Sequence, residues 1–172
     1  MNALDRFFEK ENNPETIRLK EAIVSKIREI INIYLDKAQE WLQPYVDKSL
    51  LSYERLNGWP FDFDKTGKFS VEYIKITYQK QEVYISPQSQ TVIAGALCRI
   101  DMWSNKKRFI FLYVDKKNNG NNPMDDMQQL PYIDSNDFEW KMLADRISIE
   151  FLQLNKDIFY EALVNLLDGN SK

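Results

Sequence analysis

The stretch "FSVEYIKITY", residues 69–78, marks the point at which the chain changes its pattern of apolar residues. Apolar and polar residues largely alternate here, and β-branched and aromatic types dominate, which is typical of a β-strand with one buried face. Three similar segments follow: "EVYI" (82–85), "TVIAGALCRIDMW" (91–103) and "RFIFLYV" (108–114). Short polar clusters separate them. We therefore expect four strands in an antiparallel meander.

Upstream of residue 69 the apolar residues instead recur at spacings of three and four, which predicts helices. Asn13 and Pro14 are typical of a helix start, with an N-cap amide followed by a proline in the first turn. A wide apolar stripe follows, as expected of a helix that packs on a core. Its members are Ile23, Ile27, Ile30, Ile31, Tyr34, Leu35, Ala38, Trp41 and Leu42. We expect Pro44 to kink or end this helix, and a second helix to run from Tyr45 to Leu56 before Asn57-Gly58.

Beyond the four strands the polar segment 115–131 predicts a loop. The three residues 134–136 are candidate N-caps for a helix that begins near Asp137. Helical spacing is kept by its apolar set, Trp140, Leu143, Ala144, Ile147, Phe151, Leu152 and Leu154. A last helix should end at Asp168-Gly169. The sequence thus predicts one α+β domain over residues 1–172, with two N-terminal helices, a four-stranded antiparallel meander and two C-terminal helices packed on the sheet.

Composition excludes several classes of enzyme. The chain has no histidine, so neither a Ser-His-Asp triad nor a His-ligated metal is possible. Its five glycines are too scattered for a phosphate-binding loop. The charged N-terminus and the absence of an apolar run of ~18 residues predict a cytosolic protein without a signal peptide or spanning helix. The one cysteine, Cys98, lies in an apolar strand and is expected to be a small buried side chain.

The segment "DFDKTGKF", residues 62–69, is similar to the opening of an EF-hand calcium loop. Asp62, Asp64 and Thr66 take alternate positions before Gly67. The bidentate glutamate of such a loop belongs at its twelfth position, which is Tyr73 in this chain. We therefore interpret the segment as an acidic turn, and we expect no metal or other cofactor here.

A second set of acids flanks the hairpin "RIDMWSNKKRFIFLYVDKK", residues 99–117. Asp101, followed by Asp115 and Lys117, resembles the motif of the PD-(D/E)xK nuclease superfamily. The resemblance implies that the two acids hold magnesium across adjacent strands while the lysine helps to activate a water, and an upstream helical glutamate such as Glu40 would complete the set. A divalent-metal-dependent nuclease is therefore the alternative function, and a structural subunit is a third possibility. The superfamily's sheet mixes parallel and antiparallel strands, whereas four consecutive strands are expected here.

Charge distribution favours a protein partner. The net charge is −3, so nucleic acid is not favoured as a partner. Residues 116–172 carry ten acids and six bases, whereas residues 57–115 carry six acids and eight bases. We interpret the acidic C-terminal third as a docking surface for a basic protein. The predicted partner-binding residues are Asp125, Asp126, Tyr132, Asp134, Asp137, Phe138 and Glu139. These features predict a non-enzymatic binding protein, a small cytosolic inhibitor or immunity-type protein that masks a basic partner such as a toxin.

Overall fold

The computed structural model describes residues 2–63, 66–89, 95–117, 127–145 and 147–168. Within these ranges the chain forms three α-helices, α1 (Ala3–Glu11), α2 (Pro14–Asp47) and α3 (Lys156–Leu167). Seven strands are described, β1 (Ser52–Phe63), β2 (Gly67–Tyr78), β3 (Gln81–Gln88), β4 (Cys98–Trp103), β5 (Arg108–Asp115), β6 (Phe138–Asp145) and β7 (Glu150–Gln153). Two short 3-10 helices, η1 (Met127–Tyr132) and η2 (Ser135–Asp137), precede β6.

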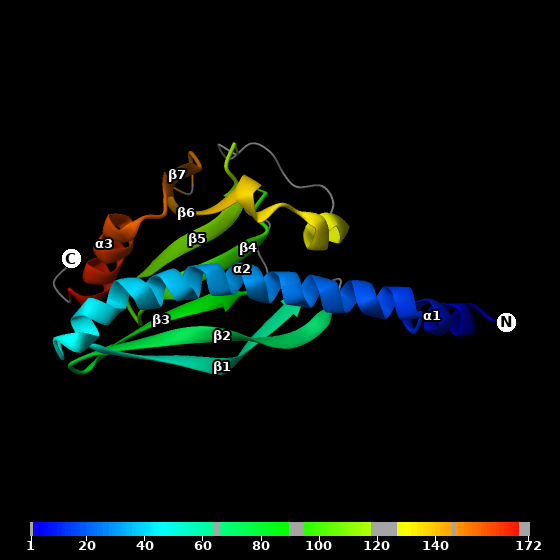
Figure 1. Ribbon diagram of the computed structural model, residues 1–172, viewed down its shortest axis with the longest axis horizontal. Helices are drawn as coiled ribbons and strands as arrows, with labels where there is room; N and C mark the ends of the chain where they lie inside the picture. The colour runs from blue at the N-terminus through cyan, green and yellow to red at the C-terminus, as the bar shows by residue number, and fades with distance from the viewer. Residues whose placement is uncertain (1, 64–65, 90–94, 118–126, 146, 169–172) are drawn as a thin grey trace.

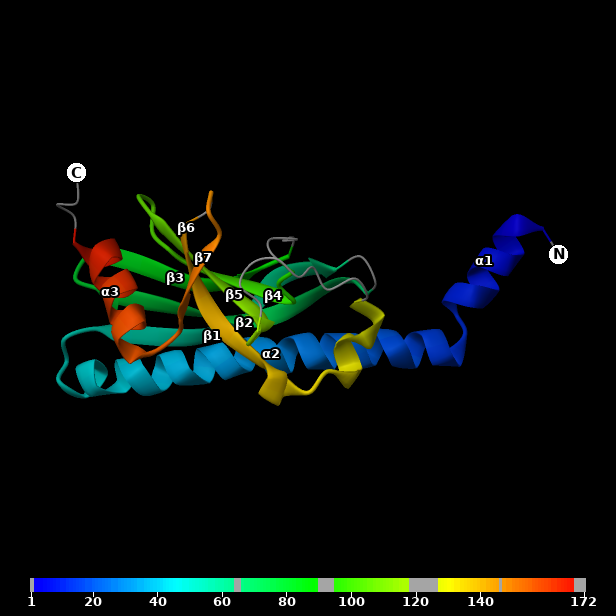
Figure 2. The same ribbon diagram turned by 90° about the horizontal axis from the view of Figure 1, so that it is seen from above.

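The strands form one antiparallel sheet in the order β1-β2-β3-β4-β5-β6-β7, so each strand pairs with its neighbours in sequence. The long helix α2 and the short helix α3 lie on one face of this sheet, which we call the helix face (Figures 1 and 2). The main core lies between these two helices and the sheet. The opposite side is the open face, where a smaller cluster forms around Ile110, Leu112, Val114 and Leu143.

The helix α2 begins as predicted. Asn13 caps it, with its side chain accepting a hydrogen bond from the Glu15 backbone N–H at 2.8 Å, and Pro14 occupies the first turn. The apolar stripe predicted for this helix is buried except for Trp41, which is partly buried against the core. α2 is therefore the central helix of the fold, and its outer side remains exposed to solvent.

The predicted second helix over residues 45–56 is wrong. α2 continues through Pro44 to Asp47, because the proline falls in the last turn on the exposed side, where water can satisfy the freed carbonyl. From Ser52 the chain is a strand. Asn57-Gly58 does not end a helix but lies at a register shift in β1, where Gly58 has a φ of +99°. A left-handed backbone suits glycine, and such a bulge bends the strand.

The helix predicted from residue 137 is also wrong, because residues 138–153 form strands β6 and β7. Phe138, Trp140 and Met142 alternate and face the main core, while Leu143 joins the cluster on the open face. Asp134 is indeed a cap, but it caps the short η2, with its side chain accepting from the Asn136 backbone N–H. The sheet consequently has seven described strands rather than the four predicted, which became β2 to β5.

The prediction of a last helix ending at 168–169 agrees with α3, which Asn155 caps through a 3.0 Å bond from the Ile158 N–H. α3 packs beside the C-terminal half of α2. The Tyr160 hydroxyl donates to the Trp41 carbonyl at 2.7 Å, and the rings of Trp41 and Phe159 are in contact. α3 and the C-terminal half of α2 therefore cover this end of the helix face together.

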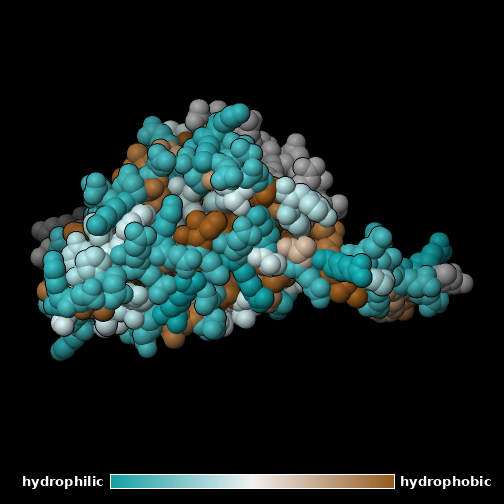
Figure 3. All heavy atoms as spheres, in the orientation of Figure 1, coloured by the Kyte–Doolittle hydropathy of each residue, from teal (hydrophilic) through white to brown (hydrophobic). Residues whose placement is uncertain are grey.

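The first helix, α1, was not predicted and has no buried residues among those described. It extends away from the sheet at the end opposite the C-terminus (Figure 2). Leu4, Phe7 and Phe8 are each more than half exposed. Apolar atoms are visible along this projecting end among hydrophilic ones (Figure 3). A capping box at Asn2 stabilises the first turn of α1. The ion pair between Glu11 and Lys20 connects α1 to α2.

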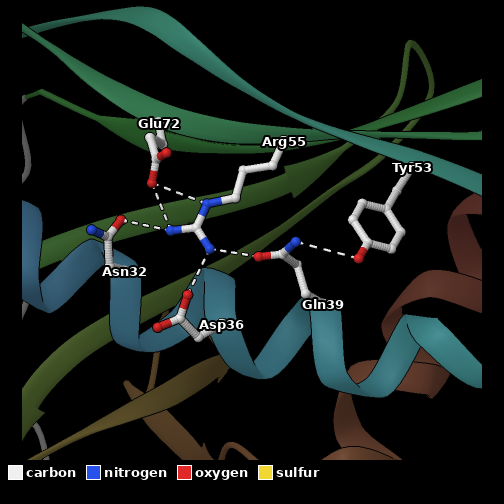
Figure 4. A network of polar contacts seen from close by, with 6 residues as sticks. All are labelled: Asn32, Asp36, Gln39, Tyr53, Arg55 and Glu72. Carbon is white, nitrogen blue, oxygen red and sulfur yellow. Dashed lines mark hydrogen bonds and ion pairs between the residues drawn. The ribbon is translucent and has the colours of Figure 1, made fainter.

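A partly buried arginine connects α2 to the first two strands. Arg55 of β1 donates to the Glu72 carboxylate twice, at 3.0 and 2.6 Å, and to Asp36 at 2.6 Å (Figure 4). Its remaining bonds go to the side-chain oxygens of Gln39 and Asn32 on α2. Burial alone would lower the pKa of Arg55, but the bonds to Asp36 and Glu72 outweigh it and raise that pKa. The guanidinium therefore stays charged and links α2 to β1 and β2 through hydrogen bonds and ion pairs.

Candidate binding surfaces

The structure does not assemble the nuclease-like acids into a site. Asp101 is fully buried on the open face and is held by two arginines. Arg99 donates to both its carboxylate oxygens, at 2.6 and 2.8 Å, and Arg108 lies 3.2 Å from one of them. Both carboxylate oxygens are therefore occupied by cationic donors, so Asp101 is an ion-paired structural residue here.

Asp115 lies on the other side of the sheet. Asp101 pairs with Ile110 across β4 and β5, and Asp115 follows Ile110 by five positions (115 against 110), which reverses the side-chain direction. The two acids are also separated by about 17 Å along the strand at a rise of ~3.4 Å per residue. Lys117 donates its backbone N–H to Asp115, and Glu40 is exposed on α2. The resemblance to the nuclease motif therefore has no counterpart in space.

The described part of the EF-hand-like segment consists of the end of β1, Thr66 and the start of β2. Asp62 pairs with Lys68 across the two strands, and Asp64 lies outside the described residues. Glu72, the nearest candidate for a bidentate ligand, is engaged by Arg55. Among the residues that the structure describes, no three acidic or cysteine side chains are grouped so that they could hold a metal ion.

The predicted acidic docking residues have four different outcomes in the structure. Asp125 and Asp126 lie outside the described residues. Phe138 is not an exposed anchor, because it packs on the main core and stacks on Tyr113 with ring centroids 5.7 Å apart. Glu139 is on the open face, where it accepts from Gln153 at 2.9 Å and lies 3.6 Å from Lys141.

The remaining three residues are all exposed and lie within one short segment. Tyr132 is 80% exposed, and Asp134 and Asp137 are exposed immediately after it. The structure adds Glu29 from α2, which the sequence did not indicate, because the Ser135 hydroxyl donates to its carboxylate at 3.3 Å. We call Tyr132, Asp134, Asp137 and Glu29 the acidic ridge. No sequence signal could have joined two segments more than a hundred residues apart.

The acidic ridge is held in place from beneath. Leu130 is fully buried against the core, and Ile133 is packed on it as well, so the exposed Tyr132 is displayed between two anchored neighbours. Lys26 of α2 donates to the Ser135 hydroxyl at 3.0 Å, and the Asp137 carbonyl accepts from the Lys116 N–H. An aromatic ring presented from a fixed backbone loses little conformational freedom on binding.

Cys98 is buried in the main core, as expected of a small apolar side chain. Its burial raises the pKa of the thiol to about 12, so it is neutral and a poor nucleophile at ordinary pH. The described helices include none that is long and apolar enough to cross a membrane. Comparisons of the chain with protein-family models, with curated proteins and with solved structures find no match.

Proposed function

We propose that the chain is a non-enzymatic binding protein, a small cytosolic inhibitor of the immunity type that masks a basic partner protein such as a toxin. The observation that carries this proposal is the acidic ridge, in which an aromatic side chain that is 80% exposed is followed by two exposed aspartates on an anchored segment. Exposed tyrosines in fixed positions are frequent hot spots of protein interfaces, and nearby charges select and steer the partner.

The charge of the ridge favours a basic partner. Glu29, Asp134 and Asp137 come from two segments that meet at Ser135, so three carboxylates belong to the same two segments as the exposed ring. Lys26 pairs with Glu29 at 3.0 Å, but its side chain is only 13% exposed and presents little charge to solvent. A lysine- or arginine-rich surface would find acceptors here, and association would be faster at low salt.

Charge reversal tests this function. The variant Asp134→Lys/Asp137→Lys is compared with wild type and with Glu21→Lys/Glu40→Lys, which makes the same change of charge on the exposed side of α2. The three immobilised proteins are exposed to an extract of the source organism, and proteins bound by wild type and the α2 variant but not by the ridge variant are identified. Binding kinetics are then measured with the purified partner.

We expect a partner of high isoelectric point whose association with the ridge variant is slowed about tenfold at low salt. Tyr132→Ala should leave association nearly unchanged and speed dissociation about 30-fold, as expected for a hot spot of ~2 kcal/mol. An acidic partner, or equal binding by all three proteins at low salt, contradicts the proposal.

A further inference from the structure

The open face carries a row of four directly paired side chains that the proposed function does not use. Lys75 of β2 is paired with Tyr84 of β3, Tyr84 with Trp103 of β4, and Trp103 with Arg108 of β5. Two aromatic rings are therefore flanked by a cation on either side. At ~4.8 Å between strands, the row spans about 14 Å.

The two rings are held in a defined arrangement. Tyr84 and Trp103 are stacked, with centroids 5.0 Å apart and planes 22° from parallel. The indole N–H of Trp103 donates to the buried Ser86 hydroxyl at 2.9 Å, which fixes the ring's orientation. Arg108 lies over the indole at 5.9 Å while it contacts Asp101. The ring pair is thus preorganised, although both rings remain partly exposed.

A groove of about 390 Å³ opens beside this ring pair, between the β2–β3 turn and the β4–β5 turn. Tyr84 and Trp103 form part of its wall. Lys80 and Gln81 line it at the first turn, Ser104, Asn105 and Lys106 line it at the second, and Leu166 of α3 adds an apolar side chain. Aromatic surface, amide groups and lysines therefore converge on one concavity.

The local charge is positive, although the whole chain is acidic. Lys75 is balanced by two acids, because Glu54 is its direct partner on β1 and Glu82 lies 2.7 Å away. Glu82 lines the groove and accepts a bond from the Tyr84 hydroxyl at 2.9 Å. Asp101 beneath the row is neutralised by Arg99 and Arg108. Lys80 and Lys106 are left as surplus positive charge at the rim, so an anionic ligand is favoured.

We propose that this groove binds a short stretch of single-stranded nucleic acid, with a base stacked on the outer side of Tyr84 and touching the edge of Trp103, and with phosphates near Lys80 and Lys106. Stacking platforms flanked by cations are the usual means of binding such strands without sequence preference. A purely acidic peptide would not need the rings, and a neutral sugar would not need the lysines. The proposal is independent of the acidic ridge.

Fluorescence anisotropy at low salt tests the proposal with three labelled probes. The probes are an oligothymidylate of about eight nucleotides, an abasic oligomer of the same length and charge, and polyglutamate. We expect the oligothymidylate to bind about tenfold more tightly than either control, because stacking contributes to its affinity alone. Binding should weaken steeply with added salt. Equal binding of the abasic oligomer or of polyglutamate overturns the proposal, as does no binding of oligothymidylate at about 1 mM protein.

Variants locate the site. Lys80→Ala/Lys106→Ala should weaken oligothymidylate binding about tenfold, whereas Lys116→Ala/Lys117→Ala, which removes the same charge beyond the far end of β5, should not change it. Tryptophan emission should be quenched on binding, and Trp103→Phe should abolish most of that quenching although three other tryptophans remain. Thermal melts confirm that each variant is folded. Equal losses in the two lysine pairs, or unchanged quenching in Trp103→Phe, contradict the assignment.

Discussion

Replacing Arg55 by methionine should destabilise the protein by about 2–4 kcal/mol. Methionine keeps a long unbranched stem but removes the guanidinium that bonds Asn32, Asp36, Gln39 and Glu72. Asp36 is 67% exposed, so water hydrates its carboxylate once the guanidinium is removed. The ion pair with Asp36 therefore accounts for at most about 1 kcal/mol of the lost stability. Most of the loss arises at Glu72, which is 32% exposed, and at the two amide oxygens.

Urea denaturation followed by circular dichroism measures this change, and the melting temperature should fall by about 5–15 °C. Arg18→Met is the matched control, because Arg18 is exposed near the start of α2 and its loss should change stability by less than about 0.5 kcal/mol. Adding Glu72→Met to Arg55→Met should recover about 1 kcal/mol, since it removes the half-buried carboxylate left without its donor.

If the free energy of unfolding of Arg55→Met lies within about 0.5 kcal/mol of the wild-type value, the reasoning is refuted. The polar contacts of Arg55 would then contribute nothing measurable to stability. A double variant that is less stable than Arg55→Met would show that the cost does not arise from the stranded Glu72 carboxylate. The first result would mean that the apolar stripe alone attaches α2 to the sheet.

Three further outcomes follow from the core and the turns. Tyr34 is fully buried and its hydroxyl has no hydrogen-bond partner among the described residues, so Tyr34→Phe should raise the free energy of unfolding by about 1 kcal/mol, and a loss of stability in urea would contradict this. Because burial raises the pKa of Cys98 to about 12, the thiol should resist thiol-reactive dyes at pH 8 until the protein unfolds, and stability should fall as the pH rises above about 8.5, where the thiol of the unfolded chain ionises. Gln79 has a φ of +54° in the β2–β3 turn, so Gln79→Gly should stabilise by up to about 1 kcal/mol in a thermal melt, and an unchanged or lower melting temperature would count against backbone strain at this position.

The parts of the fold that were predictable are those with one clear local period. α2 has a stripe, an N-cap and a proline that all agree, and β2 to β5 are bounded by turn residues. The segment from residue 138 has two competing periods. Trp140, Leu143 and Ala144 fit helical spacing, but Phe138, Trp140 and Met142 also alternate, and pairing with β5 selects the strand.

β1 was missed for the opposite reason, because its sequence contains residues that usually interrupt regular structure. Gly58 is accommodated by a register shift, and Pro60 is tolerated because β1 is the first strand of the sheet and pairs only with β2 among the described strands. The candidate surfaces depend on still longer-range relations. The ridge joins Glu29 to Ser135, and the groove joins two turns, so neither could be derived from local spacing.

The acidic ridge lies beside the middle of α2 and the basic groove lies beside α3, which allows the two proposals to be tested separately. The ridge contacts the N-terminal half of the helix through Lys26 and Glu29. The groove lies beside α3, where Lys107 in the same turn as Lys106 contacts Asn165, and α3 in turn packs on Trp41 near the other end. From Glu29 to Trp41 the helix rises about 18 Å at ~1.5 Å per residue. The two surfaces share no residue, so Asp134→Lys/Asp137→Lys should leave oligothymidylate binding unchanged, and Lys80→Ala/Lys106→Ala should leave binding of the basic partner unchanged.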